Sequence, residues 1–390
     1  MAAELAASTA ELTASEQQAQ AARTHRALRT DDVLTSVFSR LALRDGCVVA
    51  ASVCKQWRGA WHRRAKGLYR PVRVGFGDFK QGDHLTALAG VGVVVPDCEE
   101  GILHLYSSEG ERLRSGVTDF DAPVAVALDH EGDAWIVEQL SCRLGSARID
   151  WETMEPDDDH GVGSYYNDDD FEQPVDVATS GDAVVVLTHV DQTYGRVMVL
   201  DRNTAWIVSY VFGSSARGGI DELRGAMGLA LDGDFCFVAD TYNQSIAVFN
   251  WREGAFVRRY GKAGDAPELA ASFNYWEVAP TETYDDDRKS AAPGQFNEPY
   301  DVVARNKLLY VSERGGRRIQ ILRLPDDLGA ADPEVLQIIP SPGGVELAGL
   351  CLDGDRLWCI GTPYHVGYRR EDFPQYYGHA SSISIFAPIV

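Results

Sequence analysis

One pattern of short apolar segments recurs six times between residues 68 and 390. Its clearest copy spans residues 227–260, where two apolar segments join at Gly233-Asp234, the second ends on Asp240, and two further segments follow. Short apolar or alternating segments between turn residues are typical of β-strands. The other copies begin near Leu85, Val124, Val175, Tyr300 and Ala348. One four-stranded unit in six copies predicts a mainly β fold, a six-bladed β-propeller.

The two ends of this region predict how the ring closes. Residues 382–390 read as a third strand that no fourth strand follows, and residues 68–75 form an apolar segment ahead of the first copy. Pairing the two removes an open sheet edge, which would otherwise invite aggregation. We therefore expect residues 68–75 to be the outer strand of the last blade.

Particular residues in two copies resemble the NHL repeat. They are Val238-Ala-Asp240, Asn243, Ile246 to Phe249, Gly294-Gln-Phe296, Pro299 to Val302 and Arg318-Ile-Gln-Ile321. The resemblance implies a six-bladed, TolB-like propeller over residues 68–390. Seven blades would require a further repeat within residues 261–298, whose composition argues against one.

Acidic residues end four of the predicted second strands: Asp97, Glu138, Asp240 and Glu313. A ring of carboxylates can hold a hard cation such as Ca²⁺. Carboxylates at strand ends also accept backbone N–H groups from their own loops and stabilise the turns. The recurrence of these acids with the repeat favours the second interpretation.

The periodicity changes to helical before the repeats. Val33, Leu34, Val37, Phe38 and Leu41 share one face of a helix that Thr30-Asp31-Asp32 would open. A second face carries Val49, Val53, Trp57 and Trp61. Residues 25–67 are therefore predicted to be a small all-α module, and residues 1–24 a disordered or frayed tail.

The module resembles the F-box, which docks substrate receptors on the Skp-type adaptor of cullin-RING ubiquitin ligases. The matching residues are Asp31 to Leu41, Leu43-Arg-Asp45 and Val53-Cys-Lys-Gln-Trp-Arg58. Arg29-Thr30 replaces the Leu-Pro opening of the family, and Gly46 stands where a leucine is usual. The resemblance implies that the adaptor, and through it a cullin, binds Val33, Leu34, Val37, Phe38, Leu41 and Trp57.

Charge and cysteine usage limit the expected partners and location. The net charge is −22, yet residues 23–70 hold eleven Lys or Arg against three Asp, so the repeats are strongly acidic. An acidic surface repels phosphate backbones, and no apolar run has membrane-spanning length, so we expect neither nucleic acid nor membrane as partner.

The first 22 residues carry acids and no Lys or Arg, which is unlike a targeting signal. Seven scattered cysteines without CxxC spacing predict a cytoplasmic or nuclear protein.

Three long insertions are expected on one face of the propeller, at residues 150–173, 261–298 and 361–380. The last concentrates tyrosines and arginines, the residue types that dominate binding hot spots. This composition predicts a target-binding surface that includes Tyr364, Tyr368, Arg369, Arg370 and Tyr376.

Motifs for catalysis are not visible in the sequence. The nine histidines show neither HxH nor HExxH spacing, and GxSxG and Walker patterns are lacking. We therefore expect no catalytic residue, metal or cofactor, and a protein-binding receptor subunit in ubiquitin-dependent degradation. The alternatives are a metal-dependent hydrolase or lyase with its site in the propeller channel, and a scaffold outside any ligase.

Overall fold

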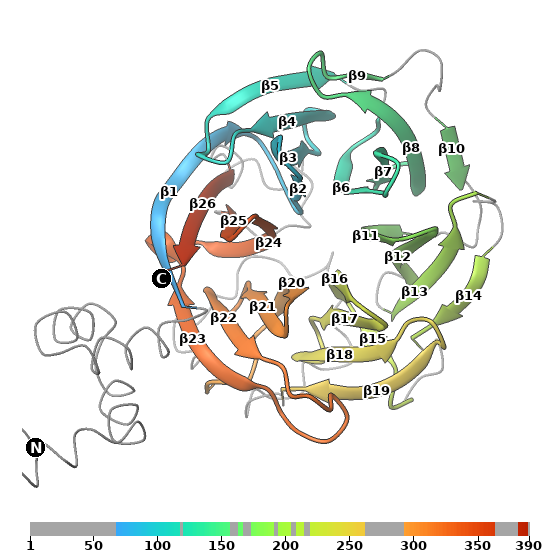
Figure 1. Cartoon of the computed structure of the whole chain (residues 1–390), viewed down its shortest axis with the longest axis vertical. Coiled ribbons are helices and arrows are strands. Elements are labelled where there is room, and N and C mark those ends of the chain that lie inside the picture. The colour runs from blue at the N-terminus through green and yellow to red at the C-terminus, as the bar shows by residue number, and fades with distance from the viewer. Residues whose placement is uncertain are drawn as a thin grey trace, which may run out of the picture. The chain divides into compact units, whose positions relative to one another are not determined.

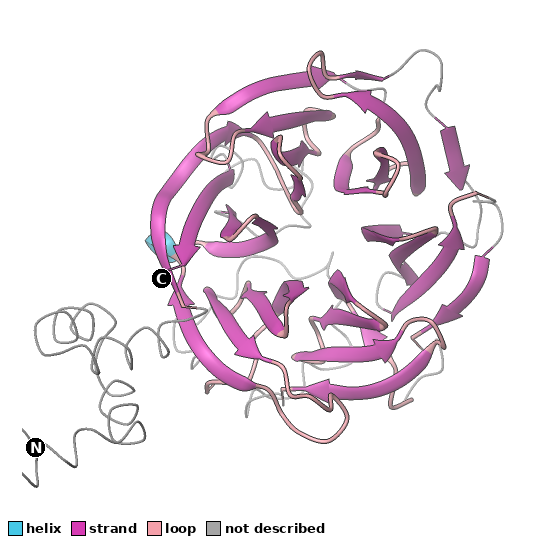
Figure 2. Ribbon diagram, in the orientation of Figure 1, coloured by secondary structure: helices cyan, strands magenta, loops and turns pink. Residues whose placement is uncertain are grey.

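The computed structural model describes residues 68–117, 120–156, 163–166, 173–190, 194–203, 208–213, 219–261, 292–362 and 381–388. The compact unit from Tyr69 to Ala387 holds six sheets, which surround one axis like the blades of a propeller (Figure 1). The described chain is built almost wholly of strands, and its one helical turn is the 3₁₀ segment η1, Pro342–Gly344 (Figure 2). The predicted mainly β, six-bladed propeller is confirmed.

The first three blades follow the chain in order. Blade 1 contains β2 (Thr86–Leu88), β3 (Gly92–Asp97), β4 (Ile102–Tyr106) and β5 (Arg112–Val117). Blade 2 contains β6 (Pro123–Leu128), β7 (Asp133–Glu138), β8 (Arg143–Asp150) and β10 (Gly163–Tyr166), with β9 (Glu155–Pro156) paired to β8. Blade 3 contains β11 (Gln173–Ser180), β12 (Ala183–Val190), β13 (Tyr194–Asp201) and β14 (Val208–Phe212), with β15 (Leu223–Arg224) paired to β13.

The remaining blades complete the ring. Blade 4 contains β16 (Ala226–Asp232), β17 (Phe235–Asp240), β18 (Ser245–Asn250) and β19 (Ala255–Tyr260). Blade 5 contains β20 (Pro299–Arg305), β21 (Leu308–Glu313), β22 (Arg318–Arg323) and β23 (Glu334–Pro340). Blade 6 contains β24 (Glu346–Asp353), β25 (Arg356–Thr362), β26 (Ser381–Pro388) and, as its outer strand, β1 (Tyr69–Phe79). The expected closure by the segment before the first repeat is therefore confirmed.

The hydrophobic core lies between the blades. The second strands are buried along almost their whole length, because both faces of each sheet pack against a neighbouring blade. Six clusters of buried side chains result, each built mainly from two adjacent blades. Blades 6 and 1, for example, share the cluster around Trp358 and Tyr106. Closing the ring therefore completes the hydrophobic core and also pairs a sheet edge that would otherwise be open.

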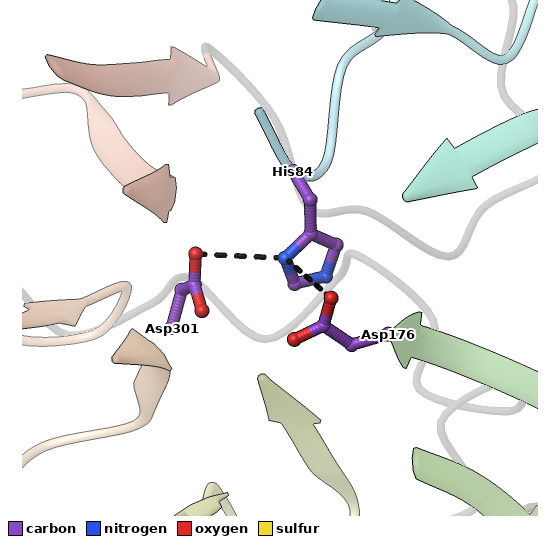
Figure 3. Close-up of side chains that lie close together, drawn as sticks. All are labelled: His84, Asp176 and Asp301. Atoms are coloured by element: carbon purple, nitrogen blue, oxygen red, sulfur yellow. Dashed lines mark ion pairs between the residues drawn. The ribbon is translucent and has the colours of Figure 1, made fainter. Parts of the chain in front are cut away.

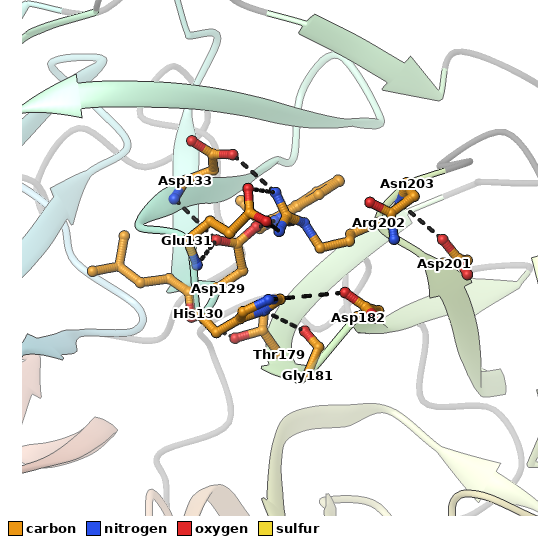
Figure 4. Close-up of polar contacts among 12 residues, drawn as sticks. Asp129, His130, Glu131, Asp133, Thr179, Gly181, Asp182, Asp201, Arg202 and Asn203 are labelled. Atoms are coloured by element: carbon orange, nitrogen blue, oxygen red, sulfur yellow. Dashed lines mark hydrogen bonds and ion pairs between the residues drawn. The ribbon is translucent and has the colours of Figure 1, made fainter.

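Ion pairs join blades 2 and 3 at the ends of the sheets opposite the acidic strand ends (Figure 4). The guanidinium of Arg202, just after β13, lies 3.1 Å from Asp129, 2.9 Å from Glu131 and 3.2 Å from Asp133. Asp129 also accepts a hydrogen bond from the indole of Trp135 at 3.1 Å. One arginine thus connects its blade to both ends of the β6–β7 turn.

None of the helices among the described residues has the length and apolar character needed to span a bilayer. The predicted helical module at residues 25–67 and the tail at 1–24 lie outside the described residues.

Gln337 joins the closing strand to blade 5. Its side-chain oxygen accepts the Tyr69 N–H at 2.6 Å, and its amide nitrogen donates to the Tyr69 carbonyl at 2.7 Å. We expect Gln337→Ala to lower the free energy of unfolding by about 1–3 kcal/mol, because two backbone groups lose their partner. Urea denaturation measures this. Glu334→Ala, which removes an exposed ion pair on the same strand, should cost under about 0.5 kcal/mol; equal costs would contradict the prediction.

Candidate functional site

Acidic side chains project from the first strands of alternate blades toward the propeller axis. In blades 3 and 5, a register shift in the ladder precedes Asp176 of β11 and Asp301 of β20. The same place in blade 4 holds Gly228. A Cβ on Gly228 would lie 2.3 Å from Asp301 Oδ1, so only glycine leaves room for the neighbouring carboxylate.

The two aspartates meet His84, which comes from blade 1 directly before β2 (Figure 3). The imidazole Nδ1 lies 3.5 Å from Asp301 Oδ2 and 3.8 Å from Asp176 Oδ1. All three residues are buried. Three blades that are not neighbours in the ring therefore meet in one polar cluster.

Each aspartate also bonds the backbone of two blades. Asp176 accepts the N–H of Val177 at 2.8 Å and that of Leu229, in blade 4, at 2.7 Å. Asp301 likewise accepts the N–H groups of Val302 and of Leu350, in blade 6, both at 2.7 Å. These N–H groups lie where the ladder is interrupted, so the carboxylates satisfy donors that would otherwise be buried without a partner.

The cluster holds a positive charge of its own. Burial disfavours the imidazolium, but the carboxylates of Asp176, Asp301 and Asp83 outweigh it and raise the pKa of His84 to about 10. Burial, with the charge of Asp301, raises the pKa of Asp176 to about 7. The imidazolium therefore occupies the position between two carboxylates where a cation would bind, and a metal ion would have to displace its proton.

The acids at the ends of the second strands accept backbone N–H groups, as the second of our two interpretations predicted, but it was wrong to place these donors only in the loops that follow the strands. Asp97 Oδ2 accepts the N–H of Lys80 at 2.6 Å, and Glu313 accepts that of Asn297 at 2.8 Å. Glu138 accepts the N–H of Asp121, and Asp240 accepts the N–H of Arg224, both at 2.7 Å. In each of these four blades a donor lies in the segment that leads into the first strand, a feature that the sequence did not reveal.

Cationic side chains complete three of these arrangements, at Glu138, Asp240 and Glu313. Arg318 and Gln320 of β22 each bond Glu313 at 2.7 Å, and Arg143 of β8 bonds Glu138 at 2.7 Å. Burial nevertheless raises the pKa of Glu313 above its usual value. In blade 3 the corresponding residue is Thr188, opposite Pro174 in the ladder. The ring of acids is therefore a set of turn anchors.

A shallow hollow of about 620 Å³ opens at the edge of blade 4. Its lining combines the exposed Ile220 with Phe256 and three arginines. Arg259 bonds Asp240, and Arg258 pairs with Asp332 at 2.7 Å. Since these cations already have acidic partners, the hollow offers mainly apolar and backbone contacts.

The residues predicted to bind partners lie outside the described residues. This holds for the adaptor-binding set Val33, Leu34, Val37, Phe38, Leu41 and Trp57, and for the target-binding set Tyr364, Tyr368, Arg369, Arg370 and Tyr376. Both sets stay predictions.

Sequence reasoning missed the cluster at the axis. One signal was present, because Pro174-Val-Asp176-Val177 and Pro299-Tyr-Asp301-Val302 repeat one pattern at the start of a first strand. Nothing in the sequence indicated that His84 would join them, since it belongs to another blade.

Solved structures with the same architecture support the fold. A structure of luciferin-regenerating enzyme matches with a TM-score of 0.55 at 13% identity, over 82% of this chain and 96% of that one. A crystal structure of the WD40 repeats of RRP9 matches with a TM-score of 0.51 at 11% identity, over 82% and 99%. At these identities the likeness shows a β-propeller and nothing of its activity.

The sequence itself matches no model of a known family and no curated protein. The F-box and NHL-repeat resemblances therefore gain no support from these comparisons.

Removing Glu313 should expose the cost of a buried, unpaired charge. The side chain of Arg318 is only 7% exposed, so Glu313→Ala leaves its guanidinium buried without the carboxylate. We expect a loss of about 3–5 kcal/mol in the free energy of unfolding, measured by urea denaturation. The double variant Glu313→Leu with Arg318→Met should lose less, because neither charge remains. A double variant as unstable as the single one would contradict this role.

His84 should make stability depend on pH. Its pKa is about 10 in the folded protein and about 6.5 in an unfolded chain. Its contribution is therefore complete below about pH 6.5 and is lost as the pH rises toward about 10. We expect His84→Gln to cost most at about pH 6.5 and progressively less toward about pH 9.5, in urea denaturation at each pH. The exposed His130→Gln is the control; a cost of His84→Gln independent of pH would contradict the assignment.

Proposed function

We propose that this protein is a receptor subunit of a cullin-RING ubiquitin ligase, in which residues 25–67 dock a Skp-type adaptor and the propeller binds a target protein. The observation that carries the proposal is the helical pattern of Asp31 to Leu41 followed by Val53 to Arg58, placed immediately ahead of a propeller. A β-propeller suits a protein-interaction scaffold, because its rigid blades present loops from several repeats together.

The polar groups of the propeller also favour a binding role over catalysis. Asp176 and Asp301 each accept two backbone N–H groups and face the imidazolium of His84. The acids at the second-strand ends are occupied by backbone N–H groups of the segments that lead into the first strands. A general acid or base must instead reach a substrate and exchange a proton with it. These groups therefore act as structural anchors in our proposal, and the protein performs no chemistry of its own.

The target would bind the face that carries the long insertions. Residues 363–380 supply tyrosines and arginines, among them Tyr364, Tyr368, Arg369, Arg370 and Tyr376. The receptor would act by proximity, since holding a target lysine near the charged enzyme makes the transfer effectively intramolecular. We propose a cytoplasmic or nuclear location, consistent with the five cysteines of the described residues, all of which are free thiols.

A hydrolase or lyase with its site at the axis is the second candidate. The close approach of His84, Asp176 and Asp301 favours it, because one imidazole and two carboxylates are suitable metal ligands. We rank this enzyme candidate below the receptor, because the three side chains are buried and the two carboxylates already accept backbone hydrogen bonds. A scaffold that binds no adaptor is a third reading, which the departures at Arg29-Thr30 and Gly46 support.

Capture of the adaptor tests the proposal. We expect the tagged full chain to co-purify with a Skp-type adaptor and a cullin, and Phe38→Asp to reduce capture at least tenfold, because a charge enters the apolar face. Ser39→Asp is the matched control: it adds the same charge on the opposite side of the predicted helix and should retain capture. Quantitative pull-down measures all three. Failure of the unmodified chain to capture either protein would sink the receptor proposal.

A further inference from the structure

Blade 1 departs from its neighbours at the acidic end of its second strand. The ladder places Asp97 opposite Ile102, just as it places Glu313 opposite Arg318 in blade 5. His104, two residues into the third strand, therefore corresponds to Gln320, whose amide nitrogen donates to Glu313 at 2.7 Å. Blade 1 thus has an imidazole where blade 5 has an amide that bonds the acid.

The imidazole of His104 leaves one nitrogen without a hydrogen bond. His104 is only 1% exposed, and its Nε2 is buried. This Nε2 lies 3.6 Å from Asp97 Oδ2, which is beyond the usual 2.7–3.2 Å of an N–H···O bond. Nδ1, in contrast, lies 2.8 Å from the hydroxyl of Ser115 in β5. In the tautomer whose Nδ1 donates to that hydroxyl, the lone pair of Nε2 faces the Asp97 carboxylate, and a cation between the two would relieve their repulsion.

A third ligand completes the group. Glu100, in the turn between β3 and β4, brings a carboxylate oxygen within 4.8 Å of His104 and Asp97. The backbone holds Asp97 in place, because its Oδ1 accepts the N–H groups of Gln81, Glu99 and Glu100 at 3.2 Å. Glu100 is exposed, so an ion can reach the site from solvent.

We propose that Asp97, Glu100 and His104 bind a divalent transition-metal ion of the Zn²⁺ class. Nitrogen and oxygen ligands lie about 2.0–2.2 Å from Zn²⁺, so two of them in a tetrahedron are about 3.3–3.6 Å apart. The 3.6 Å between Nε2 and Oδ2 fits this span. Ser115 at Nδ1 is the kind of outer hydrogen bond that orients a metal-binding imidazole. Water would fill the fourth position.

The nearest competing cation is Lys80. Its ammonium lies 3.7 Å from Glu100 and 4.0 Å from Glu99, but its side chain is 52% exposed and can turn toward solvent. The aromatic rings of Phe79 and Tyr106 also lie near the imidazole, with ring centroids 6.3 and 6.5 Å from its own. Because Asp97 also anchors the backbone of Lys80, just after the closing strand β1, a bound ion would strengthen the place where the ring closes.

The site is tested by titrating Zn²⁺ into the metal-free full chain and measuring its binding by isothermal titration calorimetry. The informative variant is His104→Gln, because it installs the residue that blade 5 uses and keeps a donor for Asp97. We expect the unmodified chain to bind one more equivalent of Zn²⁺ than this variant, and Zn²⁺ to raise its Tm by more than that of the variant. Zn²⁺ bound elsewhere, for example at histidines before residue 68, cancels in the comparison.

Glu100→Gln is the second variant, because an exposed side chain can change without unfolding the blade. We expect it to lower the affinity for the Zn²⁺ ion at this site at least tenfold. Glu99→Gln, the neighbouring control, should leave that affinity unchanged. Equal stoichiometry and affinity in the unmodified chain and in both site variants would overturn the proposal. Tighter binding of Ca²⁺ than of Zn²⁺ would overturn the assigned class of ion.

Discussion

Carboxylates that accept backbone N–H groups connect the blades of this propeller to one another. At the inner strands, the ladder is interrupted by a register shift, which leaves N–H groups facing the axis. Asp176 and Asp301 satisfy these donors in two blades at once. A buried donor without a partner costs about as much as a lost hydrogen bond, so the blades depend on these two side chains for their relative position.

This arrangement concentrates negative charge on buried side chains, and His84 compensates for it. A buried carboxylate is costly unless a cation or hydrogen bonds accompany it. The protein as a whole is strongly acidic, yet its axis contains an imidazolium between the carboxyl groups of Asp176 and Asp301. In our interpretation the ring thus carries its own cation, which leaves the insertions between strands as the surfaces available for recognition.

Departures from the repeat are informative because the other blades define what each position normally does. Gln320 bonds Glu313 in blade 5, whereas His104 in blade 1 leaves a nitrogen unbonded beside Asp97. Thr188 replaces the acid altogether in blade 3. A four-stranded plan common to all six blades therefore permits different chemistry at equivalent strand ends, and the similarity to other propellers says little about that chemistry.

The sequence alone determined the six repeats, the strand ends at Asp97, Glu138, Asp240 and Glu313, and closure by the segment before the first repeat, because strand periodicity and turn residues are local properties. Tertiary structure decided which residues meet. His84 and Asp301 are far apart in the chain and come together only because the ring closes. Asp97, Glu100 and His104 are close in sequence, yet the β3–β4 turn is needed to bring their ligand atoms together. Distances between side chains of different strands depend on register and on blade packing, which no local pattern encodes.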